Sequence, residues 1–528
     1  MARLTNISLL LLAILCTYSC KDNSTDTQTT TADDSSATYT EQHRPQFHFT
    51  PAANWMNDPN GMFYYDGLYH LFYQYYPDST VWGPMHWGHA TSDDMVHWQH
   101  QPIALYPDSI GCIFSGGAIV DVQNTSELST TDTPPIVATF THHDFKGEKA
   151  KTNDFQKQSI AYSLDGGSTW TKYNGNPVIP NTEKIKDFRD PKVVWHEDSQ
   201  QWILALAAYD RVKFYSSTDL KDWQYQSDFA IEGDHRLWEC PDLFPMQVEG
   251  SSDTKWVLIV SIQKEAPNDG TATSYFVGDF DGSSFISDVS TQKWLDWGTD
   301  NYAFVTWNNV PKTDGRTLGI GWMSNWQYAQ IVPTDNWRST MTLPRSLQLH
   351  NINGTYQLSS SPVAELTKLR KTPTSIEPMT FSNATELDLP FAPSQAEYDL
   401  TVNMKATKAS NFGLKFENPQ GEYFTILFDT SADSMYVDRT HSGSNIFSEA
   451  FYKKVHAAPV DLSGAELDIK LYMDVASAEI FVNEGALNFT SIFFPTEPFS
   501  KVSLVAEGGA VSLAASKVYQ MDGIWEGL

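Results

Sequence analysis

The stretch that decides the fold is Asp58-Pro59-Asn60-Gly61-Met62-Phe63, a turn sequence that leads directly into an apolar strand. The same order of acidic residue, turn and apolar strand returns at residues 190–194 (DPKVV) and 239–244 (ECPDLF). Residues 114–120 (FSGGAIV) and 300–304 (DNYAF) fit the pattern more loosely. These five starts lie about sixty residues apart on average, as expected for the blades of a β-propeller.

A second repeat indicates the turns between the outer strands of these blades. In each copy a serine ends a strand of period-2 alternation, an aspartate follows two residues later, and a tryptophan follows the aspartate after four or five residues. The three copies are Ser92, Asp94 and Trp98; Ser163, Asp165 and Trp170; and Ser217, Asp219 and Trp223. The first strand of every propeller blade lines the central channel, so residues at equivalent positions of these strands converge at one mouth. We therefore expect Asp58, Asp190 and Glu239 to lie close together.

The rest of the chain indicates an all-β protein, a five-bladed β-propeller followed by a C-terminal β-sandwich. Alternating strands are predicted near residues 398–404, 423–428, 467–473 and 502–505, and a short helix begins near Pro362. We predict a signal peptide over residues 1–19 and a disordered polar tether over 20–42. The propeller is predicted over 43–350, a linker over 351–370 and the sandwich over 371–528.

The N-terminus predicts export and lipidation. Arg3 precedes the apolar run of residues 7–15, which has the length of a signal-peptide core and is too short for a membrane-spanning helix. The run leads to Ser19 and Cys20, and this resembles a bacterial lipoprotein signal in which Cys20 becomes the acylated first residue. A plain secretory signal is the alternative. The anchored protein would face either the periplasm or the cell exterior.

Composition and the remaining motifs narrow the possible partners. The net charge of −29 argues against nucleic acid or an anionic membrane surface, both of which require a positive field. A neutral substrate is therefore favoured. His86-x-x-His89 has ligand-like spacing but no third ligand, so we predict no metal and no cofactor. His142 and His143 are expected in a surface cluster. Oligomeric state is not indicated by the sequence.

Three convergent carboxylates suit the cleavage of a glycosidic bond with retention, which needs two carboxyl groups about 5–5.5 Å apart. Taken alone, Asp58 is a good turn residue, and Asp190 beside Arg189 is an ordinary local ion pair. Glu239 has the apolar neighbours Trp238 and Leu243, a setting expected to raise a carboxyl pKa toward the range that a general acid needs. Together the three favour a catalytic function.

Several segments resemble glycoside hydrolase family 32, which comprises invertases, inulinases and levanases. These segments follow the family's order: residues 55–61 (WMNDPNG), 73–75 (YQY), 82–89 (WGPMHWGH), 114–116 (FSG), 189–191 (RDP), 238–241 (WECP) and 478–483 (AEIFVN). The resemblance extends from about His48 to the end of the chain. It implies that Asp58 is the nucleophile, Glu239 the acid/base and Asp190 the stabiliser of the transition state.

The resemblance also implies a pocket for the terminal fructose. Its lining residues would be Asn57, Gln74, Trp82, Phe114, Ser115, Arg189 and a later tryptophan, either Trp322 or, as we favour, Trp326. The implied function is that of an exo-acting β-fructosidase of levan, inulin or sucrose-type substrates. An endo-acting enzyme, a fructosyltransferase and a non-catalytic glycan-binding protein are the alternatives. The linkage preference stays open, and the sandwich is expected to brace the propeller.

Overall fold

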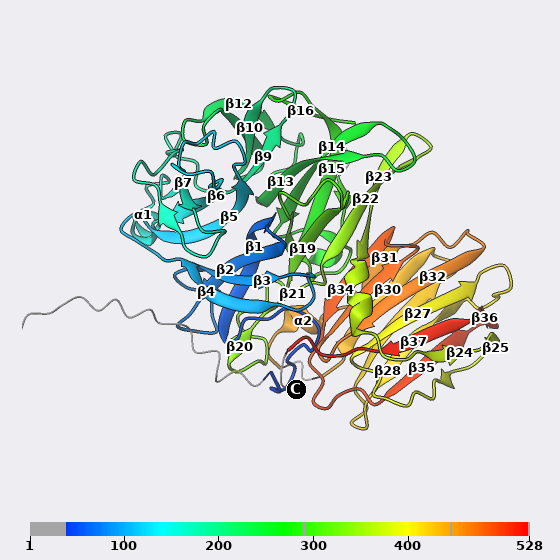
Figure 1. The fold of residues 1–528 in the computed structure, drawn as a ribbon. Helices are drawn as coiled ribbons and strands as arrows, with labels where there is room; N and C mark the ends of the chain where they lie inside the picture. The colour runs from blue at the N-terminus through cyan, green and yellow to red at the C-terminus, as the bar shows by residue number, and fades with distance from the viewer. Residues whose placement is uncertain (1–38, 289–291, 444–445, 526–528) are drawn as a thin grey trace, which may run out of the picture. The chain divides into compact units, whose positions relative to one another are not determined.

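A computed structural model describes residues 39–288, 292–443 and 446–525. The expected signal peptide, Cys20 and the tether up to residue 38 lie outside the described residues. The described chain is almost entirely β-structure, and its first part forms five sheets arranged around a centre (Figure 1). The predicted five-bladed propeller is confirmed, and so is the C-terminal sandwich.

The five blades follow one another along the chain. The first blade contains β1 (Asn54–Tyr65), β2 (Leu68–Tyr76), β3 (His86–Ser92) and β4 (Gln99–Leu105). The second contains β5 (Cys112–Val120), β6 (Ile136–His143), β7 (Gln156–Ser163) and β8 (Thr171–Lys172), with α1 (Phe145–Ala150) between β6 and β7. The third contains β9 (Phe188–His196), β10 (Gln201–Ala208), β11 (Val212–Ser217) and β12 (Gln224–Phe229).

The last two blades contain extra short strands. The fourth is made of β13 (Trp238–Gln247), β14 (Thr254–Ile262), β15 (Ala272–Phe280), β16 (Phe285–Ser287) and β17 (Lys293–Trp294), with the 3₁₀ turn η2 (Pro267–Asp269). The fifth is made of β18 (Tyr302–Thr306), β19 (Thr317–Met323), β21 (Thr340–Met341), β22 (Arg345–Ile352) and β23 (Thr355–Pro362). The short β20 (Trp337–Arg338), which lies between β19 and β21 in the sequence, pairs in parallel with β1 and so links the last part of the propeller sequence to its first strand.

Each of the five predicted starts falls in or directly before the first strand of a blade. The serine–aspartate repeat is also explained by the structure. The serine ends the third strand of blades one, two and three, and its hydroxyl donates to the aspartate at 3.2, 2.7 and 3.0 Å respectively. This local side-chain bond closes the turn into the fourth strand.

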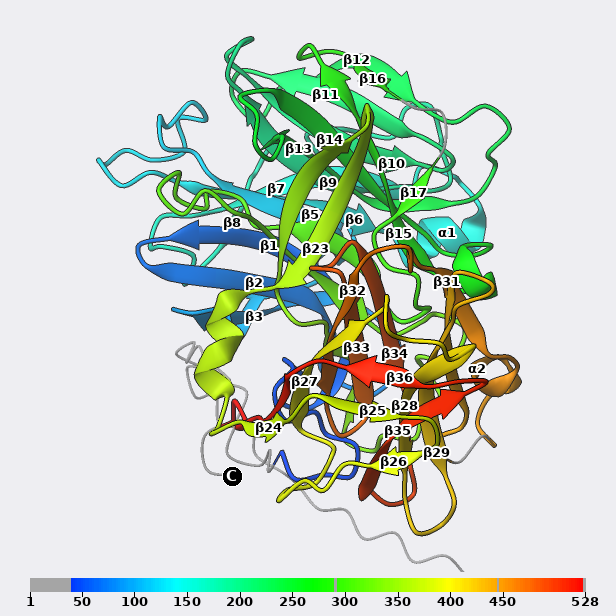
Figure 2. The ribbon, with the colours of Figure 1, turned by 90° about the vertical axis from the view of Figure 1, so that its right-hand side faces the viewer.

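The C-terminal sandwich consists of two antiparallel sheets (Figures 1 and 2). One sheet contains β24 (Thr374–Ile376), β25 (Met379–Phe381), β27 (Ala396–Asn403), β32 (Glu466–Met473), β33 (Ser477–Val482), β34 (Leu487–Ile492), β36 (Val511–Leu513) and β37 (Ser516–Gln520). The other contains β26 (Thr385–Glu386), β28 (Asn411–Glu417), β29 (Tyr423–Asp429), β30 (Ser434–His441), β31 (His456–Pro459) and β35 (Lys501–Glu507), and α2 (Glu449–Tyr452) follows β30. Alternate residues of β27 and its neighbours fill the core between the sheets.

Buried charges join the propeller to the sandwich. Arg345 of β22 donates to Asp296 at 3.0 Å and to Glu479 of β33 at 2.5 Å. His48 lies 2.7 Å from Asp474 and 3.0 Å from Glu479. All five side chains are excluded from solvent, and we call them the interface cluster.

The structure differs from the expected boundaries at two places. The segment 351–370, expected to be a linker, contains β23, which pairs with β22 along its whole length, and the 3₁₀ turn η3 (Ala364–Leu369) (Figure 2). Tyr39, expected in the disordered tether, is buried and stacks on Trp525 with ring centroids 4.1 Å apart. Aromatic packing on the segment after β37 holds this end of the tether. None of the helices in the described residues has the length and apolar character needed to cross a bilayer.

Candidate active site

A cavity of about 220 Å³ lies where the first strands of the blades approach one another. Its lining includes all ten of the residues that the sequence predicted for the catalytic centre and the pocket: Asn57, Asp58, Gln74, Trp82, Phe114, Ser115, Arg189, Asp190, Glu239 and Trp326. These residues come from β1, β2, β5, β9, β13, and the segments after β2 and β19. Residues far apart in the sequence therefore share one cavity, as the propeller topology requires.

Every first strand has a β-bulge next to this cavity. The register of pairing shifts between Met56 and Pro59 in β1, and between Ile113 and Gly116 in β5. The corresponding shifts lie at residues 189–192, 239–242 and 302–305. A bulge inserts an extra residue, bends the strand and redirects its side chains. The bulges in these five strands therefore explain how regular strands turn polar side chains into one cavity.

Three bulges contain a left-handed residue, which is uncommon for residues other than glycine. Asp190 has φ of 65°, Cys240 has 47° and Ala303 has 53°. Such conformations cost roughly 1–3 kcal/mol each and persist where the surrounding structure holds them. At Asp190 and Cys240 the strained backbone lies in contact with the carboxylates. The strain is thus concentrated in the part of the fold that shapes the cavity.

The carboxylates do not occupy equivalent positions in their blades, which corrects the simplest form of the sequence prediction. Glu239 is the last paired residue before its bulge, Asp190 is the first residue of its bulge, and Asp58 is the second. The three motifs look equivalent in sequence because each has a turn proline shortly after its acid, and this similarity hides the stagger. The stagger places three acids at three successive steps along the first strands, and all three still line the same cavity.

Asp58 is almost completely buried and has few partners. The Ser115 hydroxyl donates to its Oδ2 at 2.7 Å, and the Cys240 thiol lies 3.6 Å from the same oxygen. Its Oδ1 has no hydrogen-bond partner among the described residues. Burial raises the pKa of Asp58, the Ser115 hydrogen bond opposes this, and the charge of Glu239 adds to the increase. An underpartnered carboxylate of this kind can act directly on a bound molecule.

Asp190 is held by backbone groups on either side. Its Oδ2 accepts the Cys240 N–H at 3.0 Å, and its own N–H donates to the Thr141 hydroxyl at 3.0 Å. Burial raises the pKa of Asp190 to about 7, although the Arg189 guanidinium works in the opposite direction. The negative charges of Glu239 and Asp58 contribute to the rise.

Glu239 has polar partners, in contrast to the apolar setting expected from its neighbours in sequence. Nη2 and Nε of Arg189 donate to its Oε1 at 2.7 and 3.1 Å, and the Tyr302 hydroxyl donates to Oε2. Trp238 and Leu243 instead pack in the core between the third and fourth blades. The reason is the bulged strand, which directs the carboxylate into the cavity and the apolar neighbours into that core.

The Arg189 guanidinium pairs with several carboxylates at once. Besides Glu239 it donates to Asp187 at 2.6 Å, and its Nε lies 4.0 Å from Asp190. Burial works against its charge, but Glu239, Asp190 and Asp187 outweigh burial and raise the pKa of Arg189 well above its usual value. The guanidinium therefore stays charged and holds the Glu239 carboxylate in place.

Aromatic side chains form the walls of the cavity. Trp82 meets Phe114 edge to face with ring centroids 5.9 Å apart. Of the two tryptophans considered for the opposite wall, Trp326 lines the cavity, while Trp322 is fully buried and packs against it at 4.9 Å. The indole N–H of Trp55 fixes Asn57 by donating to its Oδ1 at 2.7 Å.

A second layer of charge closes the channel beneath the carboxylates. Nζ of Lys192 lies 3.2 Å from Oδ2 of Asp242, and the same oxygen accepts hydrogen bonds from the N–H and hydroxyl of Thr306, each at 2.7 Å. All three residues are buried. The site is thus bounded below by paired side chains from β9, β13 and β18.

Sequence reasoning missed several residues of the site. Tyr302 belongs to the fifth predicted start, whose weak match hid its contact with Glu239. His143 was expected at the surface, but both His142 and His143 are buried, because they end the central strand β6 of the second blade. His143 lines the cavity and stacks on Phe114 with ring centroids 4.2 Å apart.

The other histidine motif is structural. His89 is buried in the first blade, and its Nε2 lies 3.0 Å from Nδ1 of His70. Within residues 39–288, 292–443 and 446–525, no group of three or more His, Cys, Asp or Glu side chains is arranged to hold a metal ion.

Glycoside hydrolysis uses a pair of carboxyl groups. The propeller has acidic side chains in an aromatic-walled cavity, and this is the kind of site found in a glycoside hydrolase. The family models agree: the glycosyl hydrolases family 32 N-terminal domain matches residues 48–362, and the family 32 C-terminal domain matches residues 365–520. The chain therefore belongs to glycosyl hydrolases family 32.

Similar proteins include a levanase and exo-inulinases. A levanase of Bacillus subtilis is 44% identical over 497 residues, which cover 93% of this chain and 72% of the levanase. An extracellular exo-inulinase of Aspergillus niger is 36% identical over 521 residues, covering 92% of this chain and 96% of the inulinase. The crystal structure of an exo-inulinase from Aspergillus awamori superposes with a TM-score of 0.84 at 32% identity, covering 92% of this chain and all of that one.

Proposed function

We propose that this enzyme hydrolyses terminal β-D-fructofuranosides of fructans, levan or inulin, and of sucrose-type oligosaccharides, with retention and by exo action. The observation that carries the proposal is the meeting of Asp58, Asp190 and Glu239 in one small cavity. Similarity to a levanase and to exo-inulinases supports the fructosyl substrate. Paired side chains beneath the cavity and aromatic walls around it favour a pocket that accepts a chain end over an open cleft.

In the proposed mechanism, Asp58 is the nucleophile. One of its oxygens attacks the anomeric carbon of the fructosyl unit, and the bond to the leaving oxygen breaks as Glu239 gives that oxygen its proton. Glu239 then removes a proton from water, the water oxygen bonds to the anomeric carbon, and the bond to Asp58 breaks. Two inversions give net retention, and Asp58 and Glu239 return to their starting states.

The neighbouring groups fit supporting roles in this scheme. Asp190 accepts hydrogen bonds from sugar hydroxyls and stabilises positive charge that develops on the ring. Arg189 and Tyr302 orient the Glu239 carboxylate through the bonds described above. Ser115 holds Oδ2 of Asp58, which leaves Oδ1 available for attack. Asn57, Gln74, Trp82, Phe114 and Trp326 shape the pocket for the terminal fructose.

The test is a time-resolved product profile of the full-length protein on levan, inulin and sucrose. Free fructose from the earliest time point supports exo action, and the faster polymer identifies the preferred linkage. A ladder of oligosaccharides would instead indicate an endo-acting enzyme, and fructose transfer to a sugar acceptor would indicate a fructosyltransferase. No product from any of the three substrates would favour a glycan-binding protein.

A chemical rescue tests the assignment of the two carboxylates. In a Glu239→Ala variant, azide can replace water in the second step, and retention predicts a β-fructosyl azide product. An Asp58→Ala variant is the matched control, because it has no nucleophile to form the intermediate. An α-configured azide, or near-normal fructan hydrolysis by Glu239→Ala, would overturn the assignment.

We further propose that the enzyme acts outside the cytoplasm and is attached to a bacterial membrane through lipid on Cys20. The apolar run of residues 7–15 and the polar residues 21–38 fit a lipoprotein signal followed by a spacer. Metabolic labelling with a fatty-acid analogue should mark the wild-type protein and leave Cys20→Ala unlabelled. Export of an unlabelled wild-type protein would instead support a plain secretory signal.

We also propose that the sandwich braces the propeller. Arg439 of β30 is buried, donates to Asp300 at 2.5 Å and to the Tyr328 hydroxyl at 2.9 Å, and so holds residues next to Tyr302 and Trp326. The interface cluster forms a second such link. In both links, buried charged groups contact one another in place of water. These contacts fix the sandwich against the propeller.

A further inference from the structure

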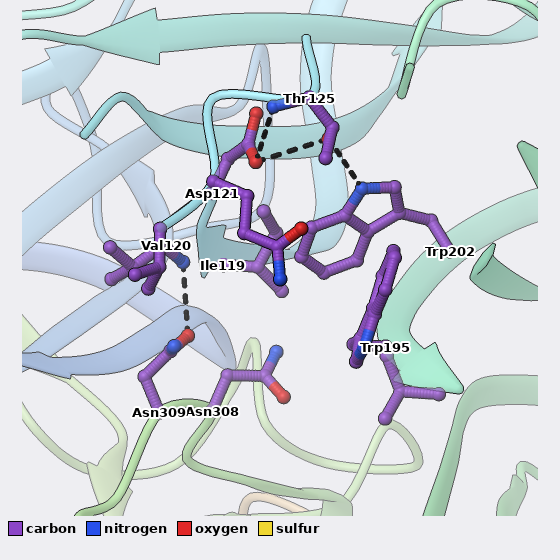
Figure 3. A pocket seen from close by; sticks show the side chains of 11 residues that line it. Ile119, Val120, Asp121, Thr125, Trp195, Trp202, Asn308 and Asn309 are labelled. Atoms are coloured by element: carbon purple, nitrogen blue, oxygen red, sulfur yellow. Dashed lines mark hydrogen bonds between the residues drawn. The ribbon is translucent and has the colours of Figure 1, made fainter. Parts of the chain in front are cut away.

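A second cavity of about 280 Å³ lies at the opposite end of the first strands. It is bordered by Ile119 and Val120 at the end of β5, and by Val194 and Trp195 near the end of β9 (Figure 3). Ser115 and Asp190 lie four or five residues earlier in the same two strands, and both line the catalytic cavity. At about 3.3 Å per residue, the two cavities are roughly 15 Å apart along the channel.

Two tryptophans form one side of this cavity. Trp195 and Trp202 meet edge to face with ring centroids 4.9 Å apart. Both indoles are fixed by their N–H groups, since Trp202 donates to the Thr125 hydroxyl and Trp195 to the Glu197 carboxylate, each at 2.8 Å. Trp202 is buried and Trp195 is half-buried, so the cavity has a rigid aromatic surface that a ligand can reach.

Amide side chains form the facing side (Figure 3). Asn308 donates to the carbonyls of Ala118 at 2.8 Å and Val193 at 3.3 Å, and Asn309 accepts the Val120 N–H at 2.9 Å. These bonds use one end of each amide and fix its orientation. Oδ1 of Asn308 and Nδ2 of Asn309 have no partner within the described part of the chain. The lining residues therefore carry one acceptor and one donor without a partner among the described residues.

The cavity contains no available charge. Asp121 is its one ionisable lining residue, is fully buried, and accepts the N–H groups of Thr125 at 2.9 Å and Ser126 at 2.8 Å. Its carboxylate therefore stabilises the loop that follows β5 by accepting backbone N–H groups of that loop. An anion would meet no cation here, and a cation would meet a carboxylate that is already satisfied. A neutral ligand with both hydroxyl groups and an apolar face suits the lining, and a sugar ring has both features.

We propose that this cavity is a second, non-catalytic site that binds a saccharide unit of the polymer degraded at the active site. The identity of that saccharide as fructosyl rests on the proposed function. Because the two cavities open at opposite ends of the propeller, a short substrate cannot occupy both. A polymer held at the second site raises the local concentration of chain ends, and this benefits levan and inulin but not sucrose.

The test compares polymer and sucrose kinetics in three variants of the full-length protein. Trp195→Ala removes the accessible ring, and Gln123→Ala removes an exposed amide at the rim that has no hydrogen bond among the described residues. Tyr225→Ala is the matched control, because Tyr225 is an exposed aromatic of the same blade outside the cavity. We expect Trp195→Ala to raise KM for the polymer roughly tenfold, Gln123→Ala to raise it less, and all three to leave sucrose turnover unchanged.

Direct binding separates this proposal from the proposed function. Affinity electrophoresis in gels containing levan, inulin or dextran is run with an Asp58→Asn chain, with and without Trp195→Ala. Fructan-specific retardation that Trp195→Ala weakens supports the second site, even if the wild-type enzyme proved inactive on fructans. Unchanged retardation and unchanged polymer KM in both cavity variants would overturn the second site. An equal rise in KM for sucrose and polymer would also overturn it, because the effect would then come from the active site.

Discussion

Two groups of buried charges serve different purposes in this molecule. In the active site, Asp187, Asp190 and Glu239 share the guanidinium of Arg189, and the pKa of Asp190 rises to about 7. In the interface cluster, Arg345 and His48 compensate three acids, the pKa of Glu479 is lowered, and that of His48 rises to about 9. The interface cluster is fully buried and the active-site groups are nearly so. The supply of counter-charge, and not burial alone, therefore decides which groups are reactive.

Hydrogen bonds show the same difference. Oε1 of Glu479 accepts from His48 and from the Leu343 N–H, and Oε2 accepts from Arg345. Oδ1 of Asp58 accepts from no described residue. A fully satisfied carboxylate stabilises the domain interface, whereas an unsatisfied one is available to a substrate.

The sharpest way to break this comparison is to remove the unsatisfied carboxylate. Asp58→Asn keeps the size of the side chain and removes the nucleophile, so kcat should fall by at least about 10⁴-fold. The melting temperature should stay the same or rise, because a buried charge with few partners has been removed. Steady-state kinetics and thermal unfolding measure the two effects. Activity within tenfold of wild type would refute the nucleophile assignment.

Removing a satisfied charge should have the opposite result. Arg345→Met leaves Asp296 and Glu479 without their main cation, and the free energy of unfolding should fall by about 3–5 kcal/mol. Arg316→Met is the matched control, since Arg316 pairs with Asp314 and Glu365 in a partly exposed setting and should cost less than about 1 kcal/mol. Equal losses in the two variants would show that the interface cluster has no special role.

The blades and most pocket residues could be predicted from the sequence, but the contacts between distant residues could not. The periodic starts and the serine–aspartate turns predict the blades, because each repeat carries its own local turn chemistry. The pocket residues follow from the same repeats together with family motifs. The bulge stagger could not be predicted, since it depends on the strand register within each blade. The contact of Tyr302 with Glu239 could not be predicted either, since it joins two blades. The partners of Glu479 were likewise hidden, because they lie more than a hundred residues away.

The interface cluster also predicts a pH dependence of stability. Burial works against the charge of His48, but Asp474 and Glu479 outweigh it and raise its pKa from 6.5 to about 9. The stabilisation is therefore fully present below pH 6.5 and is lost as the pH rises toward 9, by about 3 kcal/mol. Unfolding by denaturant at pH 6 and pH 9.5 measures it. His48→Gln should be less stable at pH 6 and nearly independent of pH over this range, and a parallel decline in both proteins would contradict the assignment.

Tyr302 sharpens the comparison within the active site, because its hydroxyl donates to Glu239 and not to the sugar in the proposed mechanism. Tyr302→Phe should lower kcat by about 10- to 100-fold with little change in KM, since it frees a carboxylate that must point at the leaving oxygen. Tyr328→Phe is the matched control: its buried hydroxyl donates to Asp300, so its loss should affect stability and leave kcat within a few-fold of wild type. If both variants lowered kcat equally, the contact of Tyr302 with Glu239 would have no separate catalytic importance, and the effect would belong to the packing of the fifth blade.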